Sequence, residues 1–191
     1  DGDVYGDHWH GRSVLSVIVG HLPGKMLGIA PNVDVVMLRT ENADSEYLVE
    51  EDNWVSGAEL ADSIGCDVLN TSLGYTTFDD STQNHTYADL NGLTSRMTLA
   101  ADIASRKGMV VVNSAGNSGT HKMIPPASAP SAITVGGLND MNTSHRSRWQ
   151  IYHSSYGAGA GGAIKPELIA PAQWVAAPML PDTEAHRTAQ L

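Results

Sequence analysis

Short apolar segments alternate with longer, helix-like segments along most of this chain. The apolar segments have the length of strands, and they are Asn32–Leu38, Asp67–Ser72, Met109–Asn113 and Ala132–Val135. Consecutive apolar residues are typical of strands that are covered on both faces, whereas half-exposed strands alternate with polar residues. The pattern therefore predicts an α/β fold, with a parallel β-sheet and helices on both faces.

Three segments are predicted to be helical. They are Arg12–Gly20, Ser45–Ile64 and Leu93–Lys107, and Gly108 is a suitable residue to end the last of them. The polar segment Thr76–Gly92 is expected to be a surface excursion. Five apolar side chains of the central helix are expected to face the core, namely Leu48, Val49, Val55, Leu60 and Ile64.

Length and charge limit the domain organisation and the partners. The 191 residues fit a single domain, residues 1–191, better than two. The net charge is −10, and no Lys or Arg occurs from Thr40 to Ser95. This excludes nucleic acid as a partner, since phosphate binding needs clustered basic residues. The acidic interval is either a solvated face, as in adaptation to salt, or a field that attracts cations and basic peptides.

No membrane span and no secretion signal can be recognised. The chain has no run of 18 apolar residues, so no membrane-spanning helix is expected. Asp1-Gly2-Asp3 does not have the pattern of a signal peptide; one could have been removed or could lie upstream. The single cysteine, Cys66, begins an apolar run and is expected to be a small buried hydrophobe rather than a nucleophile.

The glycine-rich stretch Gly157–Gly162 is interpreted as a flexible turn. A dinucleotide fingerprint follows a strand and opens a helix. This stretch instead follows a polar segment and leads to Pro166, which prevents an early helix. A nucleotide-binding domain is therefore not expected, and no cofactor is predicted.

Small and polar residues follow the predicted strands. In open parallel sheets, functional groups gather beyond the carboxyl ends of the strands. Here those positions hold Ser72-Leu73-Gly74 and Ser114-Ala115-Gly116-Asn117. The Asn117 amide can donate to a developing oxyanion, or it can belong to an ordinary turn. His10, which precedes a predicted helix, is either a general base or a structural histidine.

The order of these segments narrows the interpretation. The chain contains, in sequence, H-G-R-S-V-L-S-V-I-V-G, G-I-A-P-N-V-D-V-V-M-L, D-V-L-N-T-S-L-G-Y, V-V-V-N-S-A-G-N-S-G, A-I-T-V-G-G-L, S-S-Y-G and K-P-E-L-I-A-P. From His10 to about Pro171, this resembles the subtilase family of serine proteases, segment by segment and in the family's order. The segments S-E-Y-L-V-E-E-D-N-W and T-Y-A-D-L-N-G are most similar to subtilases of Bacteroidetes-type bacteria.

The resemblance implies a subtilisin-like three-layer sandwich, incomplete in this chain, and roles for particular residues. His10 matches the triad histidine, and Asn117 matches the oxyanion-hole asparagine. Ser72, Leu73 and Gly74 match the edge that pairs with the substrate backbone. Ser114, Ala115 and Gly116 match the other wall of the S1 pocket, and small residues on both walls favour a sizeable P1 side chain. The implied partner is a peptide or protein substrate.

The sequence departs from the family in two places near His10. Arg12 and Ser13 replace the family's Thr and His after the H-G pair. Arg12 either lowers the pKa of His10 by like-charge repulsion or points to solvent. Family members often bind calcium after this helix, but His21–Met26 holds a lysine and no carboxylate, so no metal site is expected.

Neither the triad aspartate nor the nucleophilic serine is recognisable in these residues. Asp1, Asp3 and Asp7 are too close to His10, and Ser154-Ser155 matches a structural segment of the family. The full-length protein is expected to be a serine endopeptidase, secreted or in the cell envelope as in the family, and this chain alone is expected to be inactive. A second chain, self-association or further residues would complete the fold. The alternative is a non-catalytic pseudoprotease or peptide-binding module, against which the retained His10 and Asn117 argue.

Overall fold

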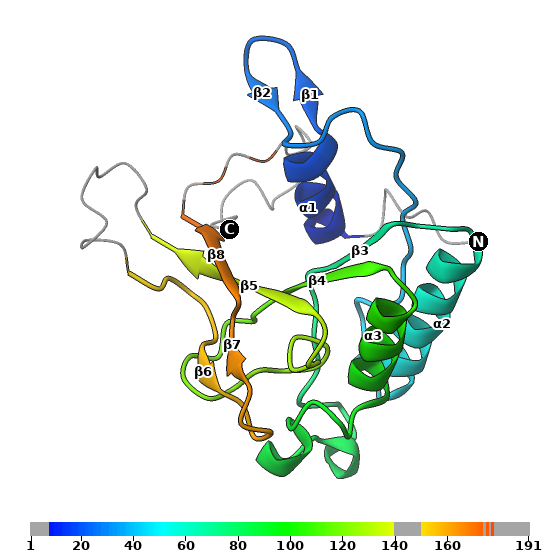
Figure 1. Ribbon diagram of the computed structural model, residues 1–191, viewed down its shortest axis with the longest axis vertical. Coiled ribbons are helices and arrows are strands. Elements are labelled where there is room, and N and C mark those ends of the chain that lie inside the picture. The colour runs from blue at the N-terminus through cyan, green and yellow to red at the C-terminus, as the bar shows by residue number, and fades with distance from the viewer. Residues whose placement is uncertain (1–7, 140–149, 174, 176, 178–191) are drawn as a thin grey trace. The chain divides into compact units, whose positions relative to one another are not determined.

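The computed structural model describes residues 8–139, 150–173, 175 and 177 (Figure 1). Their contacts divide them into two compact units. The smaller unit contains residues 8–39 with 173, 175 and 177, and the larger unit contains the described residues from Thr40 to Ala172. Each unit is described by itself.

The larger unit is built on a parallel four-stranded sheet, which confirms the predicted α/β class. Its strand order is β3-β4-β5-β8, and all three pairings are parallel. The strands are β3 (Val68–Thr71), β4 (Val110–Ser114), β5 (Ile133–Leu138) and β8 (Leu168–Pro171). Three predicted strands are therefore confirmed, and β8 is a strand that periodicity did not reveal.

The prediction of a buried strand at Asn32–Leu38 is wrong. These residues form no strand, and the side chains of Val33, Val35 and Val36 are about half exposed. A strand is stabilised by hydrogen bonds to a neighbouring strand. Among the described residues, no strand pairs with this segment. The segment is apolar, but an apolar composition alone does not provide a neighbouring strand to pair with.

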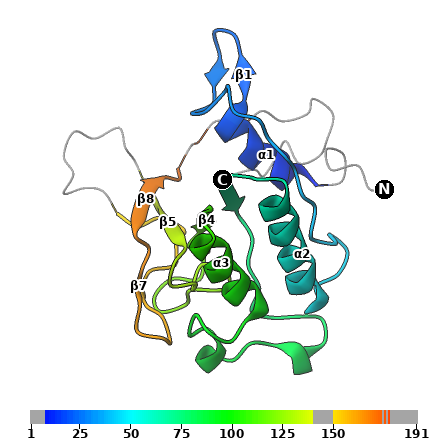
Figure 2. The ribbon, with the colours of Figure 1, turned by 45° about the vertical axis from the view of Figure 1, so that its right-hand side comes forward.

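Helices α2 (Val49–Ser63) and α3 (Arg96–Arg106) pack against each other and against one face of the sheet (Figures 1 and 2). The core between them includes Trp54, Met97, Ala101 and Val111. The helix predicted to end near Gly108 does so, because Gly108 adopts a φ of 109° directly after the cap residue Lys107.

The inward face of α2 differs from the prediction. Leu48 and Val55 pack against the core, but Val49, Leu60 and Ile64 are 47–55% exposed. The buried residues of the helix are Glu50, Glu51, Trp54, Ala58 and Ala61. They follow the 3–4 residue spacing of one helix face. Two carboxylates belong to this face because hydrogen bonds satisfy them, which hydrophobicity alone does not indicate.

The segment Thr76–Gly92 was expected to lie on the surface, but only part of it is exposed. It contains two short 3-10 helices, η1 (Ser81–Gln83) and η2 (Tyr87–Asp89). However, Phe78 and Leu90 are buried, and the Phe78 ring stacks on Tyr75 with a centroid separation of 6.0 Å. The segment is therefore tied to the core by its own apolar side chains.

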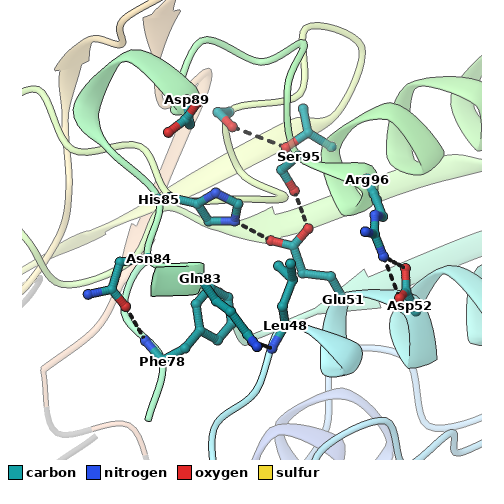
Figure 3. A network of polar contacts seen from close by, with 12 residues as sticks. Leu48, Glu51, Asp52, Phe78, Gln83, Asn84, His85, Asp89, Ser95 and Arg96 are labelled. Carbon is teal, nitrogen blue, oxygen red and sulfur yellow. Dashed lines mark hydrogen bonds and ion pairs between the residues drawn. The ribbon is translucent and has the colours of Figure 1, made fainter. Parts of the chain in front are cut away.

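Glu51 joins three segments of the larger unit (Figure 3). Its side chain is 1% exposed. One carboxylate oxygen lies 2.5 Å from Nε2 of His85, and the other accepts a hydrogen bond of 2.8 Å from the Ser95 hydroxyl. Glu51 belongs to α2, His85 to the segment between η1 and η2, and Ser95 caps α3. One buried carboxylate thus fixes the Thr76–Gly92 segment to both helices.

The glycine-rich stretch forms a hairpin, which confirms the predicted turn. Strand β6 (Gly157–Ala158) pairs antiparallel with β7 (Ile164–Lys165), and Gly162 has a φ of 80°. Cys66 is only partly buried, so its expected burial is wrong. Within the described residues, no helix is long and apolar enough to cross a membrane.

The smaller unit contains helix α1 (Trp9–Val19), which confirms the predicted helix. Its buried side chains are Ser13 and Ser16. A hairpin follows, formed by β1 (His21–Leu22) and β2 (Met26–Leu27). A Cβ atom on Gly28 would lie 2.4 Å from the carbonyl oxygen of Ile18, so only glycine lets the chain return this close to the helix.

We predict that His85→Gln destabilises the protein more at pH 6 than at pH 8.5. The hydrogen bond to Glu51 raises the pKa of His85, and the charge of Asp89 adds to this, while burial opposes it. A raised histidine pKa gives a stabilisation that is complete below about pH 6.5 and lost as pH rises through the folded pKa. Urea unfolding should show a loss of roughly 1–3 kcal/mol at pH 6, the range for hydrogen bonds to charged groups.

The exposed histidine of β1 provides the control. His21→Gln should leave the free energy of unfolding unchanged at both pH values, because His21 is exposed and no hydrogen bond links its side chain to another described residue. A loss for His85→Gln that is equal at both pH values, or larger at pH 8.5, would contradict the charged pair.

Candidate functional site

Two of the predicted substrate-binding segments meet at one edge of the sheet. In the register of β3 and β4, Thr71 lies opposite Asn113. The segment Ser72–Gly74 directly follows Thr71, and Ser114–Gly116 directly follows Asn113. Both therefore emerge at the carboxyl ends of adjacent parallel strands, which is where ligands bind in open α/β sheets.

A third segment, which the sequence reasoning missed, lies against both. A Cβ atom on Gly74 would lie 2.5 Å from the Pro125 carbonyl oxygen and 2.8 Å from the Ile124 side chain. A Cβ atom on Gly116 would lie 3.3 Å from the same Ile124 side chain. Ile124 therefore lies close to the backbone of both predicted walls. The Pro125-Pro126 pair was the available signal, since paired prolines mark an irregular, fixed segment.

Asn117 lies in the loop that follows β4 and is exposed. Ala115 continues the ladder for one more bond, its N–H donating to the carbonyl oxygen of Val135 at 2.9 Å. The chain then turns at Gly116, whose φ of 84° is strained for other residues. An exposed amide at this position can donate to an oxygen atom that approaches the sheet edge.

Acidic side chains gather near the residue that follows Gly74. The Tyr75 hydroxyl donates to Glu41 at 3.2 Å, and the N–H of Glu46 donates to Asp79 at 3.2 Å. Burial, with the charges of Glu50, Glu41 and Asp79, raises the pKa of Glu46 to about 7. Burial first, then the charges of Glu41 and Glu50, also raises the pKa of Tyr75. The acidic interval therefore places negative charge beside Tyr75.

His10 lies in the first turn of α1, in the smaller unit. The Nδ1 atom of His8 caps this helix by accepting from the N–H of His10 at 3.2 Å. Burial lowers the pKa of His10, and the charge of His8 lowers it further. The like charge that lowers this pKa is that of His8.

Among the described residues, no group of three or more His, Cys, Asp or Glu side chains could hold a metal ion. The loop after α1 forms the β1–β2 hairpin, and it contains Lys25.

Curated relatives of the chain are proteases. The chain is 32% identical to subtilisin DY of Bacillus licheniformis over 144 residues, which cover 73% of the chain and 44% of that protein. It is 28% identical to subtilisin BL of Lederbergia lenta over 160 residues, covering 83% of the chain and 49% of that protein. The chain thus spans about half the length of these relatives or less.

Solved structures with a similar fold were also found. Sphericase matches with a TM-score of 0.51 and 25% identity, over 78% of this chain and 46% of its own. The PatG macrocyclase in complex with peptide matches with a TM-score of 0.63 and 22% identity, over 88% and 44% of the two chains. The latter shows likeness of fold alone.

A family model fits nearly the whole chain. The model described as the subtilase family, peptidase S8, matches residues 1–190. This agrees with the parallel sheet, with the two small-residue segments at its edge and with the order of the sequence motifs. The chain therefore belongs to the subtilase family of proteases.

Proposed function

We propose that residues 1–191 are part of the catalytic domain of a serine endopeptidase. The observation that carries the proposal is the sheet edge at which Ser72–Gly74 and Ser114–Gly116 emerge side by side, with Asn117 exposed directly after them. Such an edge can hold an extended peptide and present a donor to its carbonyl oxygen. Family membership adds the reaction class, hydrolysis of peptide bonds.

In this proposal, His10 is the general base and acid. A serine hydroxyl attacks the scissile carbonyl carbon, and His10 takes the serine proton. When the C–N bond breaks, His10 returns the proton to the leaving amine, and water then hydrolyses the acyl-enzyme by the same route. The lowered pKa of His10 suits this role, because the neutral imidazole is the form that accepts a proton.

Asn117 is proposed to stabilise the oxyanion that forms on the carbonyl oxygen. Its amide is neutral and exposed at the sheet edge, so it can donate without carrying a competing charge. Ser72, Leu73 and Gly74 are proposed to pair with the substrate backbone. Ser114, Ala115 and Gly116 are proposed to form the opposite wall of the S1 pocket, with Ile124 adding apolar surface beside both.

The remaining triad members are proposed to lie elsewhere in a longer protein. The chain spans 35–49% of the length of three curated relatives, and its residues include no recognisable triad aspartate or nucleophilic serine. The isolated chain is therefore proposed to be inactive and to require further polypeptide for a complete fold. A peptide or protein substrate, secretion or attachment to the cell envelope, and the Bacteroidetes-type origin remain proposals.

We predict that a fluorophosphonate labels the full-length protein and not the isolated 191-residue chain. His10→Ala in the full-length protein should lower kcat by at least about 10²–10⁴-fold, the usual contribution of general base catalysis. Asn117→Ala should lower kcat by roughly 10²–10³-fold with little change in KM, a size known from subtilisin itself, a member of this family. Peptide hydrolysis and intact-mass analysis after labelling measure these effects.

The control for His10 is His21→Ala, an exposed histidine of the same unit, which should retain full activity. Stoichiometric labelling of the isolated chain would show that it contains its own nucleophile. Full activity of the full-length His10→Ala protein would show that His10 is not the general base.

We also predict that His8→Asn moves the acid limb of the kcat/KM profile of the full-length protein to higher pH. The charge of His8 contributes to lowering the pKa of His10, after burial. His8→Asn removes this charge and keeps a side-chain acceptor for the helix cap. The matched control, His21→Asn, should not move the acid limb. An acid limb that His8→Asn leaves in place would contradict the assignment.

A further inference from the structure

One buried residue, Ser155, holds the loop on both sides of Asn117. The backbone N–H of Ser155 donates to the Gly116 carbonyl oxygen at 2.7 Å. The Ser155 hydroxyl oxygen accepts from the N–H of Ser118 at 3.0 Å. Ser155 therefore binds the residue before Asn117 and the residue after it.

Asn117 itself is not held in any other way. It is exposed, and no hydrogen bond links it to another described residue. The last ladder contact before it is made by Ala115, with Val135. The position and direction of the Asn117 amide therefore depend on the backbone at Gly116 and Ser118, and both of these contact Ser155.

Ser155 is well placed to act as a fixed support. Its exposed fraction is 0%. Two further backbone hydrogen bonds follow along the chain. The N–H of Tyr156 donates to the Gly119 carbonyl oxygen at 3.2 Å, and the N–H of His121 donates to the Tyr156 carbonyl oxygen at 2.9 Å. The loop and the Ser155–Tyr156 segment thus run alongside each other.

The close approach also depends on Gly116. A Cβ atom there would lie 3.4 Å from the Ser155 hydroxyl oxygen and 3.3 Å from Ile124. Gly116 also adopts a φ of 84°, which strains other residues. The absence of a side chain lets the loop lie directly against Ser155.

We infer that Ser155 is a positioning residue for the oxyanion donor Asn117. Stabilisation of an oxyanion requires the donor to lie about 2.7–3.1 Å from the oxygen atom. A displacement of about 1 Å can cost about 10²-fold in rate. Ser155 does not touch the substrate in this account; it acts through the loop backbone. The inference rests on the proposed function, because Asn117 has no donor role in a protein without that chemistry.

The test compares Ser155→Ala with Ser154→Ala in the full-length protein. Ser154 is the matched control: it is also a buried serine, but its hydroxyl donates to the Ser155 carbonyl oxygen at 3.0 Å and contacts neither Gly116 nor Ser118. Ser155→Ala should lower kcat roughly 10- to 100-fold while KM changes less than about twofold. Ser154→Ala should leave kcat within about twofold of the unchanged protein.

A double-mutant cycle separates positioning from general loss of structure. In the Asn117→Ala background, Ser155→Ala should produce no further loss of kcat, because the donor that it positions is already absent. A loss by the same factor in both backgrounds would overturn the inference, as would unchanged kcat in Ser155→Ala. If Ser155→Ala does not fold, Ser155→Cys keeps the size of the side chain with a weaker acceptor, and the same comparisons apply.

Hydrogen–deuterium exchange supplies a readout that needs no activity. The peptide containing Ser118 should exchange faster in Ser155→Ala than in the unchanged protein, and Ser154→Ala should not change it. Unchanged exchange in Ser155→Ala would overturn the inference. An unchanged full-length protein without peptidase activity or fluorophosphonate labelling would instead contradict the proposed function, and so the two failures can be distinguished.

Discussion

The parallel pairing of β3 with β4 determines where the two proposed substrate-binding segments of the larger unit lie. Because Thr71 lies opposite Asn113, the segments that follow these residues leave the sheet at the same edge. A shift of the register by one residue would exchange the faces of every side chain on a strand and separate the two small-residue segments. The same ladder continues through Val135 of β5, which binds Ala115, and ends just before the Asn117 loop. Beyond that point the loop depends on contacts with Ser155.

Buried polar groups, rather than apolar packing alone, connect the helices to this edge. The indole N–H of Trp54 on α2 donates to the Thr71 hydroxyl at 3.2 Å, at the last residue of β3. Glu51, one turn earlier on the same helix, binds His85 and Ser95. Each of these groups would cost free energy if it were buried without its partner. The segment after the proposed substrate edge is therefore fixed from two sides, by aromatic packing of Tyr75 and Phe78 and by the Glu51 carboxylate.

The hydrophobic periodicity of the sequence predicted much of the fold. It failed where contacts with residues distant in the sequence decide whether a segment forms a strand or a side chain is buried. The sequence predicted α1, α2, α3 and three strands of the sheet, since each has a strong local pattern. It was wrong for Asn32–Leu38, which has the composition of a buried strand but no neighbour among the described residues. It also misplaced three of the five inward side chains expected of α2 and missed Glu51, because the hydrogen bonds that allow Glu51 to be buried come from residues 34 and 44 positions away. For the site, the motifs indicated Ser72–Gly74 and the Asn117 loop, but not Ile124 or Ser155, whose roles arise from contacts between distant segments.

The central proposal is that Asn117, in the loop that follows β4, donates to the oxyanion that forms during peptide-bond hydrolysis. A crystal structure of the full-length protein, inhibited by a peptide phosphonate, tests this most directly. We predict a covalent adduct on a serine outside these 191 residues, with a phosphonyl oxygen about 2.7–3.1 Å from the Asn117 amide nitrogen. An adduct that lies away from Asn117 would contradict the proposal.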